Sequence, residues 1–197
     1  MAELGLASDT VFDEYQAINH ACWEALERGE MTQEILHVER FRRFLKSKGR
    51  DDDPEKVAER FTELLGAQAI PLPGAEELVK KVSEKLPVVI LTNGITPIQK
   101  RRMAISPISE WISGLVISQE AGVSKPDPRI FEIALAGVSP KDALMIGDGM
   151  QSDILGANRA GVDACWFNPK GKTLPEGVHA EYEVKTLAEC LAIALQD

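Results

Sequence analysis

Two loops, at residues 92–94 and 125–126, combine residue types that could hold a phosphoryl group. Thr92, Asn93 and Gly94 follow the apolar run at residues 88–91, and they offer a hydroxyl, an amide and successive backbone N–H groups. The glycine permits close approach to the backbone, and N–H groups in succession suit phosphate oxygens. Lys125, in a stiff turn with Pro126, adds a cation that could neutralise phosphoryl charge.

A third loop supplies carboxylates. Asp148 stands between two glycines after the apolar run at residues 143–146, and Asp153 follows in the next helical segment. Carboxylate oxygens are ligands of Mg²⁺, which is a hard ion. Each loop alone has an ordinary interpretation as a turn, a solvated lysine or a helix cap. Their order along the chain is what predicts one site, where Thr92, Lys125 and Asp148 converge.

A parallel sheet is the element that would bring these residues together. From residue 71 onward, short apolar runs alternate with helical patterns, which is typical of βαβ units. The expected strands lie at residues 88–91, 115–117, 143–146 and 164–167, with a short edge strand at 182–184. Ligands of such sheets bind at the carboxyl ends of the strands. Because the runs are almost continuously apolar, we expect strands covered on both faces.

The segment before residue 71 shows helical periodicity only. Ser8 and Thr32 are expected N-caps. Three aspartates at residues 51–53 could form a metal cluster, but acidic residues also favour a helix N-terminus, and we prefer that interpretation for a helix over residues 54–65. We predict a helical domain over residues 1–70 and an α/β domain over residues 71–197.

Two helix starts after residue 71 have their own signals. Thr96 before Pro97 predicts a cap followed by proline at the first helical position. Thr186 and Glu189 predict a capping box for the last helix.

Composition excludes several classes of function. The 197 residues carry a net charge of -9, which disfavours binding to a nucleic acid polymer. No apolar run approaches the ~20 residues of a membrane helix, and the N-terminus lacks a signal-peptide pattern, so we expect a cytoplasmic protein. Cys22, Cys165 and Cys190 have no metal-site spacing and are expected to be buried thiols.

Taken together, the three loops resemble motifs two, three and four of the haloacid dehalogenase-like (HAD) superfamily. The helical stretch with residues 15–19, closed by residues 72–75, resembles the bacterial noncanonical pyrimidine nucleotidases of that superfamily. The resemblance implies an α/β, HAD-like Rossmannoid parallel sheet with an N-terminal all-helical cap. It also implies a Mg²⁺-dependent phosphomonoester hydrolase whose partner is a small-molecule phosphate ester, expected to be a nucleoside monophosphate.

The same resemblance implies a role for each residue of the site. Thr92 binds phosphoryl oxygens with the help of Asn93 and Gly94, and Lys125 offsets charge on the phosphate and the nucleophile. The metal ligands are the two carboxylates, with Asp148 binding Mg²⁺ and Asp153 supporting the metal site. The cap would select the leaving group.

The first motif of the family, an apolar strand ending in Asp-x-Asp-x-Thr, has no match in this chain. Asp9 and Thr10 come closest, but capping of the following helix explains them better. The missing strand should be central, between the runs at residues 88–91 and 143–146. We therefore expect a truncated product of a longer enzyme, without turnover by itself because the nucleophile is absent.

A gap in the sheet would leave orphaned backbone groups, each costing about 1–3 kcal/mol if buried. We therefore expect the two flanking strands to close on each other, or another molecule to lend a strand, as in a strand-donating homo-oligomer.

Other functions stay open at this point. A sugar-phosphate or phosphoglycolate phosphatase shares the same motifs. A dehalogenase needs no magnesium, so Asp148 and Asp153 argue against it. A catalytically inactive binding or regulatory protein would explain the missing nucleophile directly. A phosphoacceptor receiver domain is disfavoured because its acidic residues precede its Thr and Lys.

Overall fold

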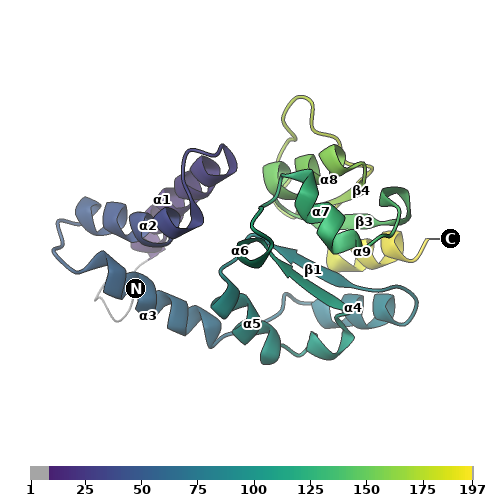
Figure 1. The fold of residues 1–197 in the computed structure, drawn as a ribbon, viewed down its shortest axis with the longest axis horizontal. Coiled ribbons are helices and arrows are strands. Elements are labelled where there is room, and N and C mark those ends of the chain that lie inside the picture. Colours follow the sequence, from purple (N-terminus) through teal and green to yellow (C-terminus); the bar gives the residue numbers. More distant parts are fainter. Residues whose placement is uncertain (1–8, 197) are drawn as a thin grey trace. The chain divides into compact units, whose positions relative to one another are not determined.

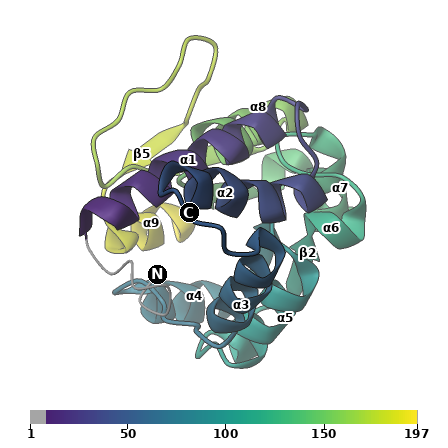
Figure 2. The same cartoon turned by 90° about the vertical axis from the view of Figure 1, so that its left-hand side faces the viewer.

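The computed structural model describes residues 9–196, which form two compact units on either side of the Leu65–Gly66 bond. The first, the helical unit, contains α1 (Asp9–Glu27), α2 (Gln33–Ser47) and nearly all of α3 (Pro54–Gly66). Figure 2 shows α1 and α2 side by side. The helices expected in this part of the sequence are thus present, and the unit boundary falls slightly before residue 70. Among the described helices, none is both long and apolar enough to cross a membrane.

Side-chain caps fix the starts of α2 and α3. Thr32 Oγ1 accepts a hydrogen bond from the Ile35 N–H at 3.4 Å, so the predicted N-cap is confirmed. Asp53 Oδ1 accepts from the N–H groups of Glu55 at 2.9 Å and Lys56 at 3.4 Å. The capping interpretation is therefore confirmed for Asp53, whereas Asp52 pairs with Arg50. The other expected cap, Ser8, lies outside the described residues.

Aromatic rings form the core of the helical unit. Tyr15 stacks on Phe41 with ring centroids 5.6 Å apart, and it meets Phe44 edge-on at the same separation. The buried Arg40 guanidinium lies over the rings of Phe41 and Phe61, 4.9 and 5.1 Å from their centroids. Burial lowers the pKa of Arg40 because it disfavours the charged form. Cation–π contacts partly replace the water that this guanidinium has lost.

The second unit, the α/β unit, alternates strands and helices as the sequence predicts. Its strands are β1 (Val89–Thr92), β2 (Gly114–Ile117), β3 (Leu144–Gly147), β4 (Asp163–Phe167) and β5 (Tyr182–Val184). Its helices are α4 (Ala75–Ser83), α5 (Thr96–Ala104), α6 (Ser118–Ala121), α7 (Pro128–Leu135), α8 (Leu155–Ala160) and α9 (Leu187–Ala194), with a π-helical turn, η4 (Met150–Ile154), and short 3₁₀ turns η2 (Ser109–Trp111) and η3 (Pro140–Asp142).

Alternating residues of β4 show that helices cover both faces of this strand. Ala164 and Trp166 belong to a core cluster with residues of α7 and α8. Cys165, between them, belongs to another cluster with Cys190 of α9 and Leu78 of α4. Because successive strand residues point to opposite faces, these helix pairs lie on opposite sides, as Figure 1 shows. All three cysteines are buried, as predicted.

The strands form two separate parallel sheets. β1 pairs with β2, while β3, β4 and β5 pair in that order. Within the described residues, β1 and β3 do not pair with each other. The expectation that these two strands close on each other is therefore wrong for this structure. Strand donation by another molecule stays a prediction.

A side chain accounts for part of this outcome. The Lys125 ammonium donates to the carbonyl of Leu91 in β1 at 2.8 Å. This bond gives one backbone acceptor of β1 a partner that does not come from a neighbouring strand. The expectation that the strands are covered on both faces is wrong for β1 and β3. No residue of β3 is fully buried, and Val89 in β1 is exposed. Among the described strands, only β4 has consecutive buried residues; the last residues of β2 and β5, Ile117 and Val184, are buried singly.

Of the two predicted helix starts in this unit, one is confirmed. Thr186 accepts from the Glu189 N–H at 3.2 Å while the Glu189 carboxylate accepts from the Thr186 N–H at 2.9 Å, which is the capping box. Thr96 is instead the first residue of α5, and Ile95 is its cap. The hydroxyl of Thr96 is buried, has no hydrogen-bond partner within residues 9–196 and makes no capping bond. Helix ends are uncertain by one residue from sequence because proline fits more than one position of the first turn.

Candidate functional site

A buried ion pair links two of the predicted site residues. The Lys125 Nζ lies 2.6 Å from Asp153 Oδ1, and the two side chains are each 9% exposed. The same ammonium donates to Leu91 O, which is the carbonyl immediately before Thr92. Lys125 therefore connects the end of β1 with η4, which follows β3. Burial strengthens this pair because little water screens it.

The carboxylate of Asp153 is fixed by a second donor. Its Oδ2 accepts a hydrogen bond from the Gly149 N–H at 2.9 Å. Because both of its oxygens are held, the Asp153 carboxylate has a defined orientation beside Gly149. Asp153 thus acts here as a partner of Lys125 and of the backbone, beyond the supporting role that the resemblance implies.

Two glycines make room for that carboxylate. A Cβ at Gly147 would lie 2.4 Å from Asp153 Oδ2, and one at Gly149 would lie 3.0 Å from the same atom. Neither distance is compatible with an ordinary contact, so both positions need glycine for space. The glycines on either side of Asp148 are visible in the sequence, but this need for space is not. The spacing Gly-x-Gly before an aspartate on a helix is the signal that could have suggested it.

A third glycine brings α8 close to the lysine loop. A Cβ at Gly156 would lie 2.7 Å from the ring of Phe131 and 3.2 Å from the Cα of Pro126. The absence of a side chain therefore allows α8 and η4 to approach the residue that follows Lys125. This contact was not predicted from the sequence.

The remaining predicted residues lie at the ends of β1 and β3 or directly after them. Thr92 is the last residue of β1, and Asp148 directly follows β3, where its carbonyl accepts from Trp166 Nε1 at 3.3 Å. Gly94 is buried beside the Gln99 side chain. Lys125 and Asp153 are brought into direct contact, whereas Asp148 is exposed and its carboxylate has no close partner among the described residues. A joint pocket for Thr92, Lys125 and Asp148 stays a prediction.

The number of carboxylates here matches the number that a protein usually contributes to a magnesium site. Mg²⁺ commonly takes one or two carboxylates, with water and substrate phosphate completing its octahedron. Asp148 and Asp153 could supply these, since they flank the same loop. Within residues 9–196, no three His, Cys, Asp or Glu side chains gather at a metal-binding distance. Any ion here would therefore depend on further oxygen ligands.

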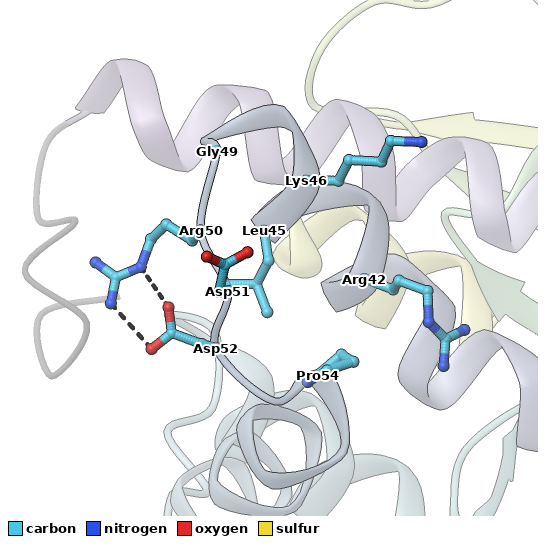
Figure 3. Close-up of a pocket in the computed structure, with 8 residues that line it drawn as sticks. All are labelled: Arg42, Leu45, Lys46, Gly49, Arg50, Asp51, Asp52 and Pro54. Atoms are coloured by element: carbon cyan, nitrogen blue, oxygen red, sulfur yellow. Dashed lines mark hydrogen bonds and ion pairs between the residues drawn. The ribbon is translucent and has the colours of Figure 1, made fainter.

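A cavity of about 300 Å³ lies elsewhere, in the helical unit. It is bounded by the end of α2, the following loop and the start of α3, and Figure 3 shows the Arg50–Asp52 ion pair at its edge. Its lining comprises Arg42, Leu45, Lys46, Gly49, Arg50, Asp51, Asp52 and Pro54. None of the predicted site residues belongs to this cavity.

Comparison with known proteins decides the family. The model of the haloacid dehalogenase-like hydrolases matches residues 5–161. The chain is a haloacid dehalogenase-like hydrolase. It is 34% identical over 181 residues to pyrimidine 5'-nucleotidase YjjG of Escherichia coli strain K12, covering 90% of this chain and 80% of that protein. It is 32% identical over 199 residues to pyrimidine 5'-nucleotidase PynA of Streptococcus pneumoniae, covering 97% and 84%.

Solved structures agree with this assignment of the haloacid dehalogenase-like fold. The structure of the putative HAD-hydrolase YfnB from Bacillus subtilis, bound to magnesium, matches with a TM-score of 0.90 and 27% identity, over 96% of this chain and 85% of that one. A dehalogenase in an intermediate complex matches with a TM-score of 0.78 and 18% identity over the same shares, which shows the fold alone. The predicted fold class and superfamily are therefore confirmed, and with them a hydrolase of the phosphoric monoester type.

Proposed function

We propose that this haloacid dehalogenase-like hydrolase acts on nucleoside monophosphates as a Mg²⁺-dependent 5'-nucleotidase, with pyrimidine or modified nucleotides as its substrates. The observation that carries the proposal is the buried Lys125–Asp153 pair beside the end of β1. It holds a cation next to the Thr92 loop, where a phosphoryl group would need one. The similarity to two proteins named pyrimidine 5'-nucleotidase supports the choice of nucleotide.

Each residue of the chain has a separate task in this proposal. The Thr92 hydroxyl and the N–H of Gly94 donate to phosphoryl oxygens, while the Lys125 ammonium offsets their negative charge. Asp153 keeps the ammonium in place. Positioned donors of this kind stabilise charge that develops during phosphoryl transfer. Asp148 and Asp153 would hold Mg²⁺, and the bound ion would neutralise further phosphoryl charge.

The proposal assigns the nucleophilic aspartate to a strand outside the described residues. The separation of β1 from β3 supports this, because an additional parallel strand could pair with both. A longer form of the chain could supply both the strand and the aspartate, whereas a second copy of this chain, which has no match to the first motif, could supply a strand alone. Sedimentation of the chain at increasing concentration separates these sources, since a strand from a second copy requires an oligomer.

Phosphate release from a panel of esters tests the activity. The panel contains pyrimidine and purine nucleoside monophosphates, sugar phosphates and phosphoglycolate, each with and without Mg²⁺. It is run on this chain, on an N-terminally extended chain and on the extended Lys125→Met variant. We expect the extended chain to hydrolyse pyrimidine nucleotides fastest, with Mg²⁺ required and Lys125→Met nearly inactive. Equal rates for all esters, or full activity in the variant, would overturn the proposal.

A further inference from the structure

The side chain of Asn93 forms a reciprocal pair of hydrogen bonds with the backbone of Lys125. Asn93 Nδ2 donates to Lys125 O at 2.8 Å, and the Lys125 N–H donates to Asn93 Oδ1 at 2.8 Å. The orientation of the amide follows from the chemistry, because a carbonyl only accepts and an N–H only donates. Both ends of the Asn93 amide are therefore directed at the lysine loop.

This pair determines where the lysine side chain starts. A lysine stem has four flexible carbons, so its ammonium has a defined position only if both the backbone and the ammonium are held. Here Asn93 holds the backbone, and Leu91 O and Asp153 Oδ1 hold the ammonium at 2.8 and 2.6 Å. Asn93 is next to Thr92 in sequence, so it ties the lysine directly to the predicted phosphate loop.

We propose that Asn93 is a positioning residue, which acts on the phosphoryl group through Lys125 instead of binding it with its own side chain. The role of Asn93 in the reaction rests on the proposed function, whereas the geometry of its hydrogen bonds does not. Both bonds fix the orientation of the Asn93 carboxamide, and turning it away to meet a phosphate would leave the part-buried Lys125 carbonyl without its donor. Such an unpaired acceptor is unfavourable.

A double-mutant cycle on the binding of inorganic phosphate distinguishes the two roles. Titration calorimetry compares the wild-type chain with Asn93→Ala, Lys125→Met and the double variant. We expect Asn93→Ala to weaken phosphate binding by about tenfold, the size of a typical coupling between contacting residues, and to change nothing further once Lys125 is Met. Equal tenfold losses in both backgrounds would show that Asn93 binds phosphate itself, and would overturn the proposal.

The chain offers a matched control for the structural cost of the variant. Asn168 makes the same reciprocal pair with Lys172, at 2.9 Å in both directions. Asn168→Ala removes an equivalent pair outside the candidate site, together with a bond from Asn168 Nδ2 to Glu183 at 2.6 Å. We expect it to leave phosphate affinity within twofold of wild type. If instead it weakens binding as much as Asn93→Ala, the loss reflects general loosening and the proposal fails.

The ammonium resonance of Lys125 in ¹⁵N-correlated NMR tests the geometry without any ligand. A buried, hydrogen-bonded ammonium exchanges slowly and should give a signal in the wild-type chain and in Asn168→Ala. We expect Asn93→Ala to lose or shift it, and Asn93→Asp, which keeps the acceptor but not the donor, to give an intermediate shift. An unchanged signal in both Asn93 variants would refute the inference, whether or not the chain binds phosphate. If the NMR signal changes as expected but the chain does not bind phosphate, the result contradicts the proposed function and not the positioning role of Asn93.

Discussion

At the scale of the residue, the candidate site depends on one buried ion pair. Lys125 and Asp153 are more than nine-tenths buried, and each has an additional hydrogen-bond partner. Buried pairs contribute little net stability compared with apolar residues, but removing one partner leaves an uncompensated charge. The pair is therefore better explained by the need for a cation at this position than by stability.

The energetic signature of that pair can be measured. Lys125→Met alone should lower the free energy of unfolding by about 3–5 kcal/mol, because Asp153 keeps a buried charge without its partner. The double variant Lys125→Met with Asp153→Leu should recover most of this loss. Urea denaturation at pH 7 measures both. A double variant as unstable as the single one would show that packing, and not charge, causes the loss.

The cap of α7 adds a pH dependence at the same scale. Hydrogen bonds from the Arg129 side chain, and then from its N–H, lower the pKa of Asp127 to about 2 from a usual value of 3.8. Because the folded-state pKa is depressed, the stabilisation is present above pH 3.8 and is lost as the pH falls towards 2. Asp127→Asn should thus lower Tm at pH 6 but scarcely at pH 2. The effect should be small, since the pair is largely solvated.

At the scale of the element, the close approach of loops and helices depends on glycine. Gly147 ends β3 and makes room for the carboxylate of η4, and Gly156 lets α8 approach the lysine loop. Neither has a positive φ, so the requirement is one of space. Local propensity would favour alanine over glycine at Gly156 in α8. The contacts of the site therefore override helix propensity here.

Matched alanine substitutions in two strands test the role of space. A Cβ at Gly147 would lie 2.4 Å from Asp153 Oδ2, while one at Gly114 in β2 would lie 3.4 Å from Val89 Cγ2. Gly147→Ala should cost about 1–3 kcal/mol of stability as an overpacked site, and should also displace Asp153. Gly114→Ala should change stability by less than about 0.5 kcal/mol. Urea denaturation measures the stability of both variants. Equal losses of stability would contradict the requirement for space at Gly147.

At the scale of the whole molecule, the described residues form two compact units with separate cores. The helical unit is held by aromatic rings, and the α/β unit by helices on two faces of β4. The segment between α3 and α4 has no regular structure, and Ile70 within it is 84% exposed. We propose that the units are separate domains, the cap and the core of the family's architecture.

Limited proteolysis tests this division. Proteinase K, which has broad sequence specificity, should cut first within residues 67–74, because Ile70 and Leu72 are exposed in an irregular segment. Mass spectrometry should find two fragments that meet within residues 67–74, and circular dichroism should show that each keeps its helices. First cleavage inside the α/β unit would show that this unit is not independently stable.

The sequence by itself determined the elements and the family. The apolar runs and helical periods located four strands, a short edge strand and the helices of both units, because these patterns depend on neighbours within a few residues. The order of the Thr92, Lys125 and Asp148 loops determined the family for the same reason, since each loop directly follows or precedes an element that the pattern locates. The spacing and apolar surroundings of the cysteines likewise predicted that all three are buried.

The tertiary structure decided how these loops meet. Asn93 and Lys125 are 32 residues apart and Lys125 and Asp153 are 28 apart, so no local pattern specifies their hydrogen bonds. The space at Gly147 and Gly156 likewise depends on which helix packs there. The separation of β1 from β3 could not be predicted either, because apolar strands pair in several ways and a side chain, Lys125, takes a carbonyl of β1. Hydrogen bonds and packing between distant segments exist only once the chain is folded.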